Sequence, residues 1–174
     1  GRPYTISIHD VDFRGNRAFV YRLSITNGPR LVAAIPPAGR RGQTHPIEFV
    51  GYGIATGKSK LESVTREVEF PSDEQSDSFL YQLETSHGMT PPLKLLLSNL
   101  EQTHEPSDAP AEAYRLNVPG SVTGTLEEAF VEDRYLLDGK QGDAWALSLE
   151  AATLGSPLDV VLSILDPDGK EIAH

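Results

Sequence analysis

Short runs in which apolar and polar residues alternate fill most of this chain, and this period of two constrains its fold more than any other feature. Successive side chains of a β-strand point to opposite faces, so each run predicts a strand with one buried face. The runs end at Gly, Pro, Asn or Asp, which favour turns. The alternating runs are residues 4–8, 19–25, 47–49, 64–70, 79–84, 93–97, 144–149 and 158–164.

No stretch keeps a helical period of 3.6 residues over three turns, and the nearest candidate, residues 125–130, is too short. Many short strands separated by turn residues indicate sandwiches or barrels. The sequence therefore predicts an all-β fold of antiparallel β-sandwiches without significant helix.

The composition excludes several kinds of chemistry. The chain has no cysteine, so it has no disulfide, no thiolate metal site and no cysteine nucleophile. No apolar run approaches the roughly 18 residues needed to span a bilayer, so we expect no membrane insertion.

The net charge of −10 is unevenly distributed. Residues 1–57 carry +4, from seven basic and three acidic residues, whereas residues 58–174 carry −14, from eight and 22. This acidic balance argues against a nucleic-acid partner. Two interpretations of the basic part are open: a patch for an anion or acidic partner, or a face turned to an acidic neighbouring domain. The basic residues concerned are Arg14, Arg17, Arg22, Arg30, Arg40 and Arg41.

Proline, glycine and charge divide the chain into four segments. Residues 1–28 form a pair of strands closed by an Asn-Gly-Pro turn, and residues 29–100 form a middle block. Residues 101–113, rich in proline and acids, are expected to be a linker, and residues 114–174 form the last block.

The last block contains three motifs in order. Residues 122–126 read Val-Thr-Gly-Thr-Leu, residues 133–137 read Asp-Arg-Tyr-Leu-Leu, and residues 165–170 read Leu-Asp-Pro-Asp-Gly-Lys. They resemble motifs of the bacterial pre-peptidase C-terminal (PPC) domain family, and residues 105–113 resemble its acidic opening. Two features depart from that family: Glu132 alone supplies the acid before the second motif, and the family's later acidic segment and strands have no counterpart before residue 174.

The front segment is similar to the end of the same family, through the runs that begin at Tyr4 and Tyr21. The middle block more weakly resembles an immunoglobulin-like module of the IPT/TIG type, through Pro29, Ile35-Pro36-Pro37 and residues 47–51. The resemblances imply immunoglobulin-like and jelly-roll-like sandwiches, with residues 1–28 completing the sandwich of residues 114–174. Two geometries are open: closure within one chain, or domain swapping into a dimer.

These families imply a non-catalytic accessory role. The chain is then expected to be a binding module from a large exported bacterial protein, secreted or at the cell surface, that acts in adhesion, spacing or binding. Its expected partners are neighbouring domains of the parent protein and extracellular polysaccharide or protein. The alternative is a carbohydrate-binding module that serves a catalytic domain elsewhere in the parent.

Few residues suggest a site. Asp166 and Asp168 lie two residues apart before Gly169, which predicts a hairpin turn, with a calcium site as the alternative and no other cofactor expected. The group of His9, Asp10 and Asp12 is expected to be an exposed strand end rather than a metal site.

The chain has no G-x-S-x-G motif, so we expect no catalytic triad and no enzymatic activity. Trp145 alternates with Leu147 and Leu149, which predicts a core residue, with a sugar-stacking surface as the alternative.

Overall fold

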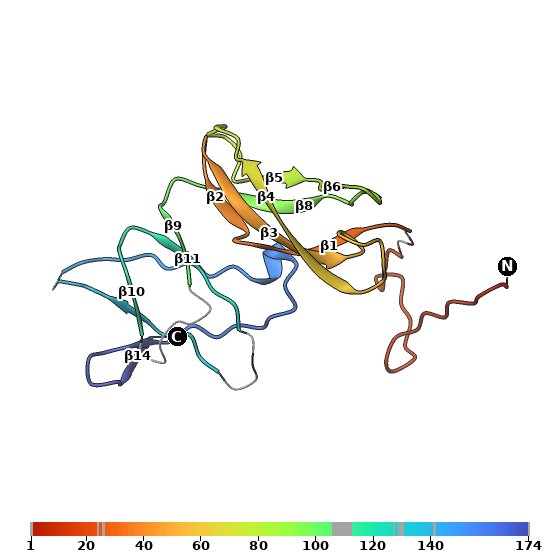
Figure 1. Ribbon diagram of the computed structural model, residues 1–174. Coiled ribbons are helices and arrows are strands. Elements are labelled where there is room, and N and C mark those ends of the chain that lie inside the picture. The colour runs from red at the N-terminus through yellow and green to blue at the C-terminus, as the bar shows by residue number, and fades with distance from the viewer. Residues whose placement is uncertain are drawn as a thin grey trace.

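A computed structural model shows two three-stranded sheets in the middle of the chain, with short two-stranded pairs beyond them (Figure 1). The structure describes residues 2–23, 25, 27–105, 113–126, 128, 131–140 and 142–173. Every regular element in these ranges is a strand, apart from one 3₁₀ turn at Ala152–Leu154. The prediction of an all-β fold is confirmed.

The first sheet has the order β1 (Arg30–Ile35), β3 (Thr44–Tyr52) and β4 (Leu61–Glu69). Its longest ladder pairs β3 with β4 antiparallel from Thr44–Glu69 to Tyr52–Leu61. Because side chains alternate along a strand, Ile47 and Phe49 of β3 point to the same face, and both are fully buried.

The second sheet has the order β2 (Ala38–Arg40), β8 (Leu93–Ser98) and β5 (Ser78–Tyr81). A small hairpin, β6 (Glu84–Thr85) with β7 (Gly88–Met89), follows β5. β8 pairs antiparallel with β5 but parallel with β2, and the sequence pattern did not predict this parallel pairing.

One apolar core lies between the two sheets. Phe49 from the first sheet stacks on Tyr81 from the second, with ring centroids 4.9 Å apart and planes 4° apart. Phe70 meets Phe79 edge-on at 5.4 Å, and burial of such rings is the main stabilising term here. The buried apolar residues are Ala34, Ile47, Phe49, Ile54, Val68, Phe70, Leu83, Leu95 and Leu97.

The last block is much less packed. β9 (Gln102–His104) pairs parallel with β11 (Ser121–Thr123), and β10 (Tyr114–Leu116) pairs parallel with β12 (Tyr135–Leu137). β13 (Ile164–Leu165) and β14 (Glu171–Ala173) form a short hairpin. None of the described apolar residues beyond Leu97 is fully buried.

Several expected strands are not formed. The described part of residues 2–28 has no strand, and the described apolar residues of the expected runs at 4–8 and 19–25 are exposed. Residues 144–149 also form no ladder, and only the end of the run 158–164 joins β13. In Figure 1 the front segment lies to one side of the two sheets and the last block to the other. The sandwich expected from these two segments stays a prediction. Within the expected linker, residues 101–113, Gln102–His104 form strand β9 and pair with β11 of the last block, so this part is not a free linker. Residues 106–112 lie outside the described residues.

Substitution of Phe49 tests whether the core of the middle block accounts for the stability of the chain. We expect Phe49→Ala to lower the free energy of unfolding by about 3–5 kcal/mol, because it removes a buried ring and leaves a cavity. Val161→Ala, at a side chain that is 85% exposed in the last block, should change it by less than about 0.5 kcal/mol. Urea unfolding followed by circular dichroism measures both; equal losses would contradict a core confined to the middle block.

Candidate interaction surface

Asp166 and Asp168 lie on the turn between β13 and β14, as the hairpin interpretation predicts. The Asp166 Oδ1 atom accepts hydrogen bonds from the backbone N–H groups of Asp168, at 3.0 Å, and Lys170, at 2.9 Å. Gly169 has a φ of 80°, in the left-handed region that this turn requires. The Asp166 carboxylate therefore already stabilises the turn.

No cluster of three or more His, Asp or Glu side chains suited to a metal ion occurs among the residues that the structure describes. Asp10 holds a local turn, because its Oδ2 atom accepts from the N–H groups of Asp12 and Arg14. The calcium alternative at Asp166 and Asp168 stays a prediction. Within the described ranges, no helix has the length and apolar character required to cross a membrane.

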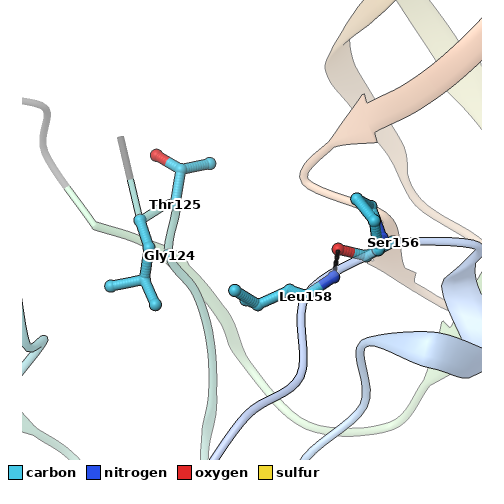
Figure 2. A pocket seen from close by; sticks show the side chains of 6 residues that line it. Gly124, Thr125, Ser156 and Leu158 are labelled. Carbon is cyan, nitrogen blue, oxygen red and sulfur yellow. Dashed lines mark hydrogen bonds between the residues drawn. The ribbon is translucent and has the colours of Figure 1, made fainter. Parts of the chain in front are cut away.

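A first hollow, of about 400 Å³, lies in the last block between the segment after β11 and the segment after the 3₁₀ turn (Figure 2). The two walls come from residues at least 30 positions apart in the chain, and Leu158 extends across the gap toward the Gly124 side. Ser156 orients this wall, because its hydroxyl accepts from the Leu158 N–H at 3.2 Å. The lining residues are Gly124, Thr125, Leu126, Ser156, Pro157 and Leu158.

Three polar side chains converge over Gly124 at the rim of this hollow. A Cβ atom at Gly124 would lie 2.6 Å from Glu105 Oε2, 2.8 Å from the Tyr135 hydroxyl and 3.0 Å from Asp133 Oδ2. The Tyr135 hydroxyl donates to Glu105 at 2.8 Å. Because Glu105 follows β9 and Tyr135 begins β12, this bond joins the two parallel strand pairs of the last block.

The convergence of acids alters their protonation. Partial burial, and then the neighbouring Glu105 carboxylate, raise the pKa of Asp133 above its usual range. Burial also raises the pKa of Tyr135, with Glu105 as the second cause. Two carboxylates this close together repel each other, so the rim favours binding of a proton or a cationic group. The sequence did not reveal this pair of acids, because Glu105 lies 28 residues before Asp133.

A second hollow, of about 300 Å³, is lined in part by Trp145. The prediction that Trp145 is a core residue is wrong, because its side chain is 43% exposed. Its indole lies against the backbone of Gly139, where a Cβ atom would be only 2.5 Å from Cη2. The strand expected there has no partner to cover its face. The lining residues are Lys140, Asp143, Trp145, Leu147, Ile164 and Ile172.

The arginines of the first half do not form one free patch. The guanidinium of Arg41 donates to the backbone carbonyls of Asp73 and Ser76 and lies 3.3 Å from Asp77. Its side chain is only 11% exposed, so Arg41 holds the loop before β5 in place. Arg30 lies over the Tyr52 ring at 5.0 Å. At the front of the chain, the exposed Arg14 lies 3.4 Å from the Asp12 carboxylate, so it also has an acidic neighbour within the chain.

Glu62 fastens the loop between β3 and β4, a role that the sequence did not reveal. Its carboxylate accepts from the N–H groups of Ala55, at 2.9 Å, and Thr56, at 3.0 Å, and from the Thr56 hydroxyl. The side chain is 5% exposed. These hydrogen bonds, led by the Thr56 hydroxyl, lower the pKa of Glu62 to about 2.

Comparison with known proteins yields no match: no family model, no curated protein and no solved structure matches this chain. The resemblances to PPC and IPT/TIG domains therefore stay predictions.

Replacement of Glu62 should weaken the middle block in a pH-dependent way. A carboxylate with a lowered pKa stabilises the folded state above its unfolded pKa of about 4.5, and loses this effect as the pH falls toward about 2. We expect Glu62→Gln to lower the melting temperature at pH 7, with a smaller loss at pH 3. Glu67→Gln, at an exposed position on β4, is the matched control; equal effects of the two variants would contradict the role of Glu62.

Replacement of Asp133 by a neutral residue should stabilise the fold near neutral pH, the opposite of the effect expected for Glu62. A carboxyl with a raised pKa favours folding below its unfolded pKa and loses this effect as the pH rises through the folded value. Asn resembles the protonated acid, so Asp133→Asn should raise the melting temperature at pH 7.5 and change it less at pH 4. Asp159→Asn, also in the last block, should show no such difference. A loss of stability at pH 7.5 in the Asp133 variant would exclude this account.

Proposed function

We propose that the chain is a non-catalytic accessory β-domain segment of an exported protein, and that it works by binding other molecules. The observation that carries this proposal is the contrast between its parts. One well-packed core lies within residues 30–97, and apolar residues on both flanks stay open to solvent. Contiguous exposed apolar surface is typical of interaction sites rather than of isolated domains.

The binding surface in this proposal is the last block, with its two hollows. Their linings are mainly apolar; Glu105 and Asp133 supply charge beside the first hollow, and Asp143 supplies it in the second. An apolar centre with a charged rim suits a partner domain that presents apolar residues flanked by basic ones. Adhesion and spacing follow when such contacts link domains at the cell surface.

A carbohydrate partner is the second candidate, and one observation favours it. The Trp145 indole approaches Gly139 with the edge of its six-membered ring and stays partly open to solvent, while Lys140 and Asp143 line the same hollow. An exposed aromatic face beside hydrogen-bonding groups is able to stack on a sugar ring and orient its hydroxyls.

A glycan array combined with a hydrolysis assay separates these functions. The accessory proposal expects no turnover of ester, peptide or glycoside substrates above that of the heat-unfolded chain; sustained turnover would refute it. Saturable glycan binding that falls at least tenfold in Trp145→Ala would favour the carbohydrate candidate. Leu80→Ala, at an exposed residue of β5, is the control that should bind like the original chain.

A further inference from the structure

We infer that the front segment of one copy of this chain adds as strands to the open last block of a second copy. This exchange would cover two surfaces that the single chain leaves unpaired. It goes beyond the proposed function because it names a second copy as the first partner of the last block.

The donor is the front segment, whose described residues belong to no strand. Tyr4, Ile6 and Ile8 alternate with polar residues, and Phe19, Tyr21 and Leu23 do the same. All six are exposed, with Tyr21 at 68% and Leu23 at 51%. The backbone hydrogen bonds found among described residues 2–23 are local turn bonds, such as Phe13 N–H to the Asp10 carbonyl. The segment therefore offers strand-like apolar faces and unpaired backbone groups.

The acceptor is the pair of extended runs at residues 144–149 and 158–163. Neither run belongs to any ladder in the described chain. Trp145, Leu147 and Leu149 share one face with period two, and all three are exposed. The second hollow lies where Trp145 and Leu147 meet the β13–β14 hairpin. A strand added here would gain backbone partners and apolar contacts together, as in β-strand addition.

Charge favours the pairing of these two segments. Residues 1–28 carry four arginines and two aspartates, a net charge of +2. Residues 113–174 carry four basic and eleven acidic residues, a net charge of −7. Two copies of the last block would repel each other, whereas a front segment and a last block attract.

The position of the folded middle domain favours a second copy over the same chain. Four residues separate Ile25 from β1, so the second donor run is tethered to one end of that domain. In Figure 1 this segment and the last block lie on different sides of the two sheets. A dozen apolar side chains that each cover roughly 80–100 Å² would bury on the order of 1,000 Å², about the lower limit for a specific interface.

Complementation between two variants tests the exchange. The double variant Tyr21→Asp/Leu23→Asp disables the donor, and Leu147→Asp/Leu162→Asp disables the acceptor. Sedimentation equilibrium of the full 174-residue chain should give a dimer or larger assembly, and either variant alone should dissociate at least tenfold more readily. An equimolar mixture should recover a one-to-one complex, because it contains one intact donor and one intact acceptor. Leu80→Asp, at an exposed residue of the middle domain, should assemble like the original chain.

Disulfide trapping gives an independent readout, since the chain has no cysteine of its own. Leu23→Cys and Leu147→Cys, placed in separate copies and mixed under mild oxidation, should form an intermolecular disulfide, whereas Leu80→Cys with Leu147→Cys should not. A chain that stays monomeric at every concentration would overturn the inference. So would a Leu23→Cys/Leu147→Cys double variant that forms only an intramolecular disulfide, because that result would show closure within one chain.

Discussion

The contact between Phe49 and Tyr81 is the interaction on which the packed middle block depends. It joins the two three-stranded sheets across their shared core, with Val68 and Leu95 buried beside it. Strands as short as β2 and β5 gain little from hydrogen bonds alone, because folding only exchanges bonds to water for bonds to protein. Burial of apolar side chains between the two sheets supplies the additional stabilisation that the short strands need. Regular sheets therefore form where two sheets cover a shared apolar core.

The same reasoning explains why the flanks stay open. A two-stranded pair is only marginally stable in water unless something covers its apolar face. β10 with β12, and β13 with β14, are such pairs, and their apolar residues remain partly exposed. Two local interactions stabilise this block: the hydrogen bonds of the Asp166 turn and the hydrogen bond between Tyr135 and Glu105. Neither interaction adds the second apolar layer that a sandwich requires.

The sequence predicted those parts of the fold in which local pattern and tertiary environment agree. The alternating runs that include Phe49, Val68, Phe79 and Leu95 are all strands, and the Asp-Pro-Asp-Gly turn lies where expected. The runs around Tyr21 and Trp145 have equally clear alternation but form no ladder. Alternation of apolar and polar residues predicts which side chains share a face of a strand, but it does not predict whether a neighbouring strand is there to pair with it.

The candidate site was less predictable, because its contacts join residues that are distant in sequence. Glu105 and Tyr135 are 30 positions apart, and neither belongs to a motif that marks a polar contact. Gly124 and Gly139 have no side chain, which lets polar groups approach Gly124 and the Trp145 indole approach Gly139. A single sequence does not show which glycines are approached this closely. Trp145 was misassigned for a related reason: alternation with Leu147 shows an apolar face, and such a face is a core only when another layer covers it. In this block the expected strand around Trp145 lacks both a neighbouring strand at its edge and a second layer over its apolar face, so its alternation alone does not bury the tryptophan.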